Sequence, residues 1–125
     1  MTHETIAFLK EAYGDNSLSS AWKKPMKQVI LSADGDSVIY SVPDAVADQL
    51  EEYCLAFCCH WIWSSPDAAK YRRNGFVCYT ERDFIDYLNT YLFPEQRSAP
   101  VLKLGWTALE DGIPEEYRPL PYFNF

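Results

Sequence analysis

Four cysteines and one histidine, all in the middle of the chain, are the residues with the clearest potential for chemistry. Cys54 and Cys58 are four residues apart, a spacing that puts both on one face of a helix, and Cys78 follows them. Thiolates so placed are zinc ligands, but His60 lies about 120° around the helix from Cys54, and no paired zinc-knuckle spacing is present. The pattern favours buried, reduced thiols over a metal site or a redox role for Cys58 and Cys59. We therefore expect no metal and no cofactor.

Patterns typical of catalysis are sparse in this sequence. His3 and His60 are its two histidines, and Cys59 points about 100° away from His60 on a helix, so the pair does not form a ready nucleophile and base. Glycine-rich phosphate loops, nucleophile elbows and dinucleotide fingerprints are absent. The sequence thus predicts a protein that is not an enzyme. One alternative stays open, a small enzyme or ligand-binding domain with a pocket lined by Trp61, Trp63, Tyr79 and Trp106 around His60, Cys59 or Cys78.

The chain is acidic, with 18 Asp and Glu residues against 11 Lys and Arg residues and a net charge of −7. This balance argues against direct contact with nucleic-acid phosphates, because few cations are available to replace counterions. It favours a partner protein with a basic surface, which the negative field would attract. The candidate partner-binding carboxylates are Asp44, Asp48, Glu51 and Glu52, then Asp83 and Asp86 with Glu81 beside them, and Glu110, Asp111, Glu115 and Glu116 near the end.

Aromatic residues make up 16% of the chain, more than a core of this size hides easily. Tyrosine and tryptophan supply much of the affinity in protein interfaces, because each covers a large area with few rotors to freeze. We expect Trp63, Trp106, Tyr122 and Phe123 to contribute to such a surface. Residues 120–125 are too apolar for a free tail, so they should pack on their own domain or in a neighbour, as in a homodimer.

Three segments have the apolar period of a helix, residues 2–13, 44–63 and 81–92. The hydroxyl of Ser41 and the ring of Pro43 predict the start of the second helix, and a capping box from Thr80 to Asp83 predicts the start of the third. Ser65 and Pro66 repeat the start signal before a shorter helix over residues 66–73.

Strand signals surround these helices. Residues 28–33 and 37–41 are rich in β-formers and flank Asp34-Gly35-Asp36, which is typical of a hairpin turn. Further strands are expected near Phe76 and Val101. The sequence therefore predicts an α+β fold, with about three main helices packed on a small antiparallel sheet.

The length of 125 residues fits a single domain over residues 1–125. The longest apolar run, residues 54–63, is far shorter than the roughly 20 residues that span a bilayer. The first five residues lack the basic patch and the small-residue cleavage site of a secretory signal, so we expect a cytoplasmic protein without a membrane segment.

Together, these patterns predict a small acidic intracellular interaction protein that binds and blocks a partner protein. A toxin-neutralising immunity protein or an inhibitor of a nucleic-acid enzyme, of the anti-defence type, has these properties. A homodimeric structural subunit is the other alternative that the sequence leaves open.

Overall fold

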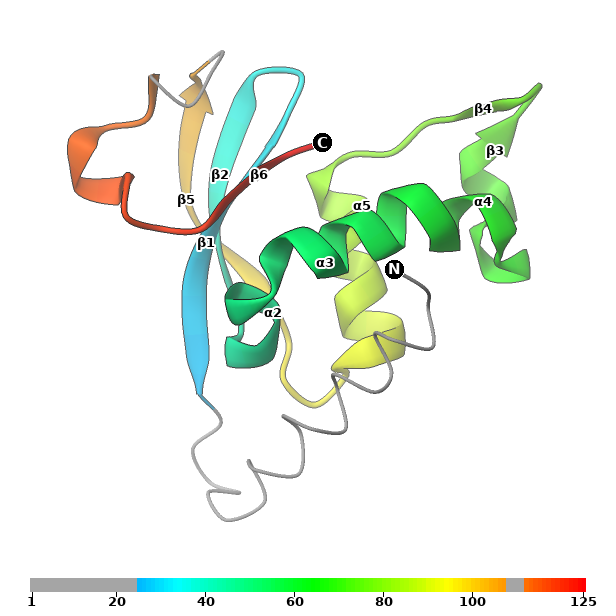
Figure 1. Cartoon of the computed structure of the whole chain (residues 1–125), viewed down its shortest axis with the longest axis horizontal. Helices are drawn as coiled ribbons and strands as arrows, with labels where there is room; N and C mark the ends of the chain where they lie inside the picture. The colour runs from blue at the N-terminus through cyan, green and yellow to red at the C-terminus, as the bar shows by residue number, and fades with distance from the viewer. Residues whose placement is uncertain (1–24, 108–111) are drawn as a thin grey trace.

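A four-stranded sheet with the strand order β5-β2-β1-β6 forms the centre of the molecule (Figure 1). The structure is a computed structural model that describes residues 25–107 and 112–125. β1 (Met26–Ala33) and β2 (Asp36–Pro43) form an antiparallel hairpin, and β5 (Ala99–Trp106) pairs antiparallel with β2. β6 (Tyr122–Asn124) pairs parallel with β1. The predicted α+β class is confirmed, and the predicted helix over residues 2–13 lies outside the described residues.

The predicted hairpin is present, and its turn has the backbone that the sequence requires. Asp34 and Gly35 both adopt positive φ, 53° and 84°, as in the tight turns that join strands of right-handed twist. Glycine suits this positive φ, and a Cβ at Gly35 would also have to displace the exposed Trp106 ring. The predicted strand near Val101 is also present, as β5.

Both faces of the sheet are covered, by different parts of the chain. Val29, Leu31 and Val38 belong to the larger core on the helical side, whereas Ile30 and Ile39 pack with Ile113 in a smaller core on the other side. Figure 1 shows the helices on one side of the sheet and the segment after β5 on the other. The period of two along each strand explains this division.

The predicted helix over residues 44–63 is interrupted, which corrects the sequence interpretation. It consists of α2 (Asp44–Asp48), α3 (Leu50–Leu55), the π-helical η2 (Ala56–Trp61) and α4 (Ile62–Ser64). Gln49 between α2 and α3 has φ −130° and ψ 41°, outside the helical region. α2 is a single turn that continues directly from β2, so the chain bends at Gln49 to redirect the next helix, although no glycine or proline marks the position.

The predicted cap of this helix is also wrong. Ser41 pairs with Gln28 in the hairpin, and Pro43 is the N-cap residue without a side-chain hydrogen bond to the first turn. Strand pairing takes precedence here, because Ser41 cannot keep its place in the β1–β2 ladder and also stand at the helix start.

The segment after α4 follows the prediction at its start and departs from it at its end. Ser65 accepts a hydrogen bond from the Asp67 N–H and begins η3 (Pro66–Tyr71), a 3-10 helix. β3 (Arg72–Arg73) and β4 (Phe76–Val77) then form a separate two-stranded sheet. The strand near Phe76 is therefore present, but it pairs with β3.

The third predicted helix is confirmed as α5 (Glu81–Tyr87) and the π-helical η4 (Leu88–Leu92). The Asp83 carboxylate accepts a 2.8 Å hydrogen bond from the Thr80 N–H, the side-chain half of the predicted capping box. Within the described residues, no helix combines the length and the apolar character that a bilayer crossing needs.

An aromatic cluster holds the helices against each other. Phe57 stacks on Trp61 with ring centroids 5.7 Å apart and meets Phe84, Tyr87 and Phe125 at tilted or edge-on angles. Such pairs stabilise by about 0.5–1.5 kcal/mol beyond the area that they bury. Part of the aromatic surplus is thus core material.

The carboxyl-terminal residues dock on their own chain, as one of the two expectations for them required. η6 (Glu115–Tyr117) precedes β6, and the Phe125 N–H donates to the Ser32 carbonyl at 2.8 Å. The Phe125 ring enters the aromatic cluster beside Phe84.

Candidate binding site

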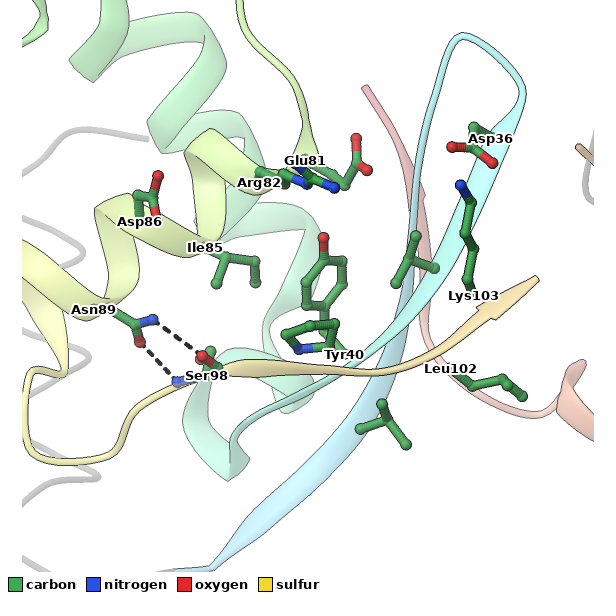
Figure 2. Close-up of a pocket in the computed structure, with 13 residues that line it drawn as sticks. Asp36, Tyr40, Glu81, Arg82, Ile85, Asp86, Asn89, Ser98, Leu102 and Lys103 are labelled. Carbon is green, nitrogen blue, oxygen red and sulfur yellow. Dashed lines mark hydrogen bonds between the residues drawn. The ribbon is translucent and has the colours of Figure 1, made fainter. Parts of the chain in front are cut away.

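A pocket of about 630 Å³ lies between α5 and the adjacent strands β2 and β5 (Figure 2). Its volume is in the range of ligand and side-chain binding pockets, roughly 300–1,000 Å³. Apolar side chains and charged groups both contribute to its wall. The lining residues are Asp36, Val38, Tyr40, Glu81, Arg82, Ile85, Asp86, Asn89, Ser98, Pro100, Val101, Leu102 and Lys103.

Two β-bulges explain why four consecutive β5 residues line one pocket. The register passes from Ile39↔Leu102 to Tyr40↔Pro100, which leaves Val101 as an extra residue. A second shift leaves Leu104 as an extra residue before Gly105, whose φ is 78°. A bulge bends its strand and re-aims the side chains, so the strict alternation of a flat strand is lost.

A buried amide clamp fixes β5 to α5 at one end of the pocket. The Asn89 amide donates to the Ser98 carbonyl at 3.0 Å, and the Ser98 N–H donates to the Asn89 carbonyl oxygen at 2.7 Å. Figure 2 shows both bonds beside the start of β5. The Ser98 hydroxyl is buried and has no hydrogen-bond partner among the described residues. The clamp therefore sets the width of the pocket and leaves one polar group unused.

Tyr40 rises from β2 into the middle of the pocket. Figure 2 shows its hydroxyl directed toward the start of α5, where Glu81 and Arg82 lie. Burial, and secondarily the negative charge of Glu81, raises the pKa of Tyr40 to about 12. Only 3% of the residue is exposed, so its hydroxyl is held as a neutral hydrogen-bonding group.

Glu81 is the least exposed of the three acidic residues that line the pocket. It is 8% exposed, and within the described chain neither a hydrogen bond nor an ion pair joins its carboxylate to another group. Its carboxylate oxygens are not among the fully buried polar atoms that lack a partner, so they are accessible to water and to an incoming group.

The charges around the pocket are mixed, with an excess of negative groups. Three carboxylates, those of Asp36, Glu81 and Asp86, face the two cations Arg82 and Lys103. Figure 2 shows the Lys103 ammonium pointing toward Asp36, at the opposite end from Asn89. The local balance has the same sign as the net charge of the whole chain, so the site attracts positive groups.

Exposed apolar side chains continue from the pocket along β5. Val101 and Leu102 are 50% and 42% exposed, and Trp106 at the end of the strand is 75% exposed. Contiguous apolar surface next to a polar pocket is typical of interaction sites. The Trp106 ring lies over the Gly35 turn.

The predicted carboxylates fall into different places. Asp86 lines the pocket, whereas Asp83 is used as the helix cap. Asp48 forms a 2.8 Å ion pair with Lys27, and Asp44 has a buried carboxylate oxygen without a hydrogen-bond partner among the described residues. Glu51 is exposed and Glu52 is half-buried on α3. Of these six, Asp86 lines the pocket, together with Glu81, which the sequence analysis placed beside Asp83 and Asp86.

The predicted aromatic anchors are divided as well. Trp63 is half-exposed on α4, far from β5 in the fold (Figure 1). Tyr122 packs in the smaller core and Phe123 against the larger one, so both serve β6. Trp106 is the predicted anchor that lies on the same strand as the pocket.

The cysteines and His60 lie outside this pocket. Burial raises the pKa of Cys54 well above its usual value and, with its hydrogen bond to Cys59, raises the pKa of Cys58 to about 11. Cys59, His60 and Cys78 are exposed. In the described residues, no three His, Cys, Asp or Glu side chains converge as metal ligands.

The pocket of the enzyme or ligand-binding alternative has a different lining from the one observed. Trp61 is buried in the aromatic cluster, and Tyr79 packs edge-on against Phe57. Trp106 lies over the Gly35 turn instead. The structure therefore does not bring these three aromatic residues together around His60.

Tyr40, Asn89, Ser98 and Lys103 are site residues that sequence reasoning missed. Tyr40 occupies an inward position of an alternating strand, which is the pattern of a core residue. Asn89 in an otherwise apolar helical stripe was the available signal, because a buried amide implies a polar partner.

Comparison with known proteins gave no match for this chain. No protein-family model, no curated protein and no solved structure matches it.

Proposed function

We propose that this protein is an acidic binding protein that docks a basic, partly apolar segment of a partner protein at the α5–β5 pocket. Binding there covers the segment and so blocks the partner, as an immunity protein or an inhibitor of a nucleic-acid enzyme does. The observation that carries the proposal is the pocket itself, where the acidic residues Asp36, Glu81 and Asp86 lie beside exposed Val101 and Leu102.

The chemistry of the pocket supports a partner with positive charge. Asp36, Glu81 and Asp86 outnumber the cations around it, and the net charge of −7 extends the attraction over the whole surface. Charge complementarity of this kind speeds association and selects the partner. The apolar residues of β5 then supply the desolvated contact that holds the complex.

The free edge of β5 favours contact through side chains over strand addition. No strand among the described residues pairs with its outer side, but the strand carries Pro100, Lys103 and two bulges. Proline, lysine and bulges are devices by which edge strands avoid pairing with other chains. The edge is thus poorly suited to a β5–β5 homodimer and better suited to a segment that fills the pocket.

The state of the cysteines bears on where the protein acts and on their reactivity. The four cysteines of the described residues are free thiols, which fits a cytoplasmic protein. Burial raises the thiol pKa of Cys54 and Cys58, so these two thiols are poor nucleophiles.

The volume of the pocket also favours one second candidate, a domain that binds a small cationic molecule in the same place. This candidate uses the pocket without the exposed part of β5. Substitutions on β5 outside the pocket, such as Trp106→Ala, distinguish the two candidate functions, since they should weaken the binding of a polypeptide but not of a small cation.

The test is a library of random peptides as long as β5, eight residues, selected on the immobilised chain. We expect enrichment of basic sequences with apolar neighbours that no longer bind the Leu102→Lys variant. Phe76→Lys is the matched control, because Phe76 is equally apolar and 72% exposed but lies on β4.

The proposal is supported if the enriched peptides still bind the Phe76→Lys variant and no longer bind the Leu102→Lys variant. The proposal is overturned if the library gives no enriched sequence, or if the enriched peptides bind both lysine variants as well as the original chain.

A further inference from the structure

The β3–β4 hairpin is an exposed element that lies outside the α5–β5 pocket. Asn74 and Gly75 form its turn with positive φ, 50° and 80°, as in the two-residue turns of β-hairpins. A Cβ at Gly75 would meet no atom within 4 Å. Figure 1 shows the hairpin at the end of the molecule away from the central sheet. The tip of the hairpin is therefore open to a partner.

The base of the hairpin is fixed by hydrogen bonds. The Arg72 guanidinium donates to the Ile62 carbonyl at 3.0 Å and to the Ser65 carbonyl at 2.9 Å. The Cys78 N–H donates to the Tyr71 carbonyl at 2.9 Å, which extends the ladder between the two strands. A segment that is ordered before contact loses less entropy on binding. The hairpin is therefore suited to docking as a unit.

The hairpin combines an exposed apolar side chain with positive charge. Phe76 is 72% exposed. Arg73, its partner across the hairpin, is also exposed and forms neither an ion pair nor a hydrogen bond with another described side chain. Residues 70–77 contain three Lys and Arg residues and no Asp or Glu, in a chain whose net charge is −7. This segment is thus basic and partly apolar.

The α5–β5 pocket has the complementary chemistry. Its carboxylates, those of Asp36, Glu81 and Asp86, outnumber its two cations. Val101 and Leu102 add exposed apolar surface beside them. A phenylalanine or arginine side chain is no larger than the small ligands that a pocket of about 630 Å³ holds. The two complementary surfaces are therefore present on one and the same chain.

We infer that the β3–β4 hairpin of one copy docks in the α5–β5 pocket of a second copy of this chain. The inference rests on the proposed function, because it uses the same pocket and names this chain as one source of the basic, partly apolar segment. In this contact Phe76 packs against the exposed apolar residues of β5, and Arg73 lies among the carboxylates. The hairpin and the pocket are different surfaces, so the contact is head-to-tail.

Self-docking makes access to the pocket depend on the concentration of the protein. Two chains with a net charge of −7 repel each other at long range. This repulsion offsets part of the local attraction, so the contact is weak. The pocket is open in dilute solution, whereas at high concentration a second copy competes with the partner protein for it.

The first experiment follows the amide shifts of the isotope-labelled chain over a dilution series. We expect residues 72–77, 81–89 and 98–103 to shift together as the concentration rises. Arg73→Glu should weaken the self-association at least about tenfold, because it brings a further carboxylate to an acidic pocket. Lys27→Glu is the matched control, since it makes the same change of net charge at a half-exposed position of β1, outside both surfaces.

A mixture of two variants then tests which surface of each copy takes part. The labelled Arg73→Glu chain keeps its pocket, and the unlabelled Leu102→Lys chain keeps its hairpin. Their mixture should restore the shifts at residues 81–89 and 98–103, whereas an unlabelled chain with both substitutions should not. Equal shifts with the two unlabelled chains would overturn the inference, because the hairpin is then not the docking element.

The results separate this inference from the proposed function. If the shifts do not depend on concentration while enriched peptides still bind at the pocket, self-docking is overturned and the docking of a partner segment stands. If the peptide library gives no enriched sequence but the mixture behaves as expected, the proposed function is overturned and self-docking stands. An equal decrease of self-association in Arg73→Glu and Lys27→Glu also overturns self-docking, since only net charge then matters.

Discussion

The two edge strands of the central sheet, β6 and β5, differ in length and in burial. β6 is three residues long and continues into Phe125, which enters the aromatic cluster. β5 is eight residues long and has no fully buried residue. β6 is therefore held by its packing, whereas β5 keeps its side chains at the surface.

This difference separates a structural edge from a binding edge. At β6, Tyr122 and Phe123 pack against the cores on the two faces of the sheet. At β5, the bulges protect the backbone from unwanted pairing, while Val101 and Leu102 remain accessible beside the pocket. Aromatic or apolar composition alone does not distinguish the two, because both edges are rich in it.

The largest expected effect comes from removing the structural edge. Deleting residues 122–125 removes the parallel pairing to β1 and the Phe125 ring from its neighbours. We expect a loss of about 3–5 kcal/mol, a large share of the roughly 5–15 kcal/mol that stabilises a domain. Urea unfolding measures it, with Trp106→Ala on β5 as the control, and equal stability of the deletion and the original chain would contradict the assignment.

The amide clamp between α5 and β5 should show the next largest effect. Asn89→Ala breaks two buried hydrogen bonds and leaves backbone groups of Ser98 without partners. We expect a loss of about 2 kcal/mol together with weaker peptide binding, because the pocket loses its fixed width. Thr90→Ala, one residue further and exposed, is the control. A destabilised variant that binds with undiminished affinity would show that the clamp does not shape the site.

The turn that supports Trp106 gives a smaller effect with a specific signature. Gly35→Ala introduces strain at positive φ and overlaps the Trp106 ring, at a cost of about 1–2 kcal/mol. Adding Trp106→Ala removes the overlap but not the strain, so the double variant should recover part of the loss. Additive costs in thermal unfolding would show that the ring does not rest on the turn.

On the binding edge, stability and binding should separate. Leu102→Lys changes an exposed position, so we expect a stability change within about 0.5 kcal/mol and a loss of peptide affinity. Calorimetric titration beside a urea curve measures both quantities. A large loss of stability would show that Leu102 contributes to the packing of the sheet. β5 would then be a structural edge strand like β6.

The smallest effect concerns the Tyr40 hydroxyl and pH. Its pKa is raised from 10.0 to about 12 in the folded state, so the unfolded chain ionises first and stability falls as the pH rises from 10 toward 12. Tyr40→Phe should match the original chain near pH 7 and lose less stability in this window, by under about 1 kcal/mol after solvent screening. Parallel curves for both proteins would contradict the assignment.

Local signals in the sequence predicted the local structure. Asp34-Gly35 predicted the hairpin turn, and Thr80 with Asp83 predicted the start of α5. The bend at Gln49 was missed because no residue there breaks a helix, and the bend arises from the join between α2 and β2. Parallel pairing of β6 with β1 joins distant parts of the chain, for which no local pattern exists.

The candidate site was less predictable than the fold for the same reason. Glu81 was among the acidic residues of its helix, but its place in a pocket depends on β2 and β5, which supply the opposite wall. Tyr40 has the pattern of a core residue, and the bulges that turn Val101 and Leu102 toward the pocket have no signature in the sequence. Charge and aromatic content predicted a binding protein, and the structure was needed to locate a pocket.

The most direct test of the binding edge is amide shift mapping with an enriched peptide on the isotope-labelled chain. The account predicts shifts concentrated at residues 81–89 and 98–103, with little change at α4, β3 and β4. Shifts centred instead on Trp63 and Phe76, the exposed aromatic residues of that other region, would contradict the claim that β5 and its pocket form the binding surface.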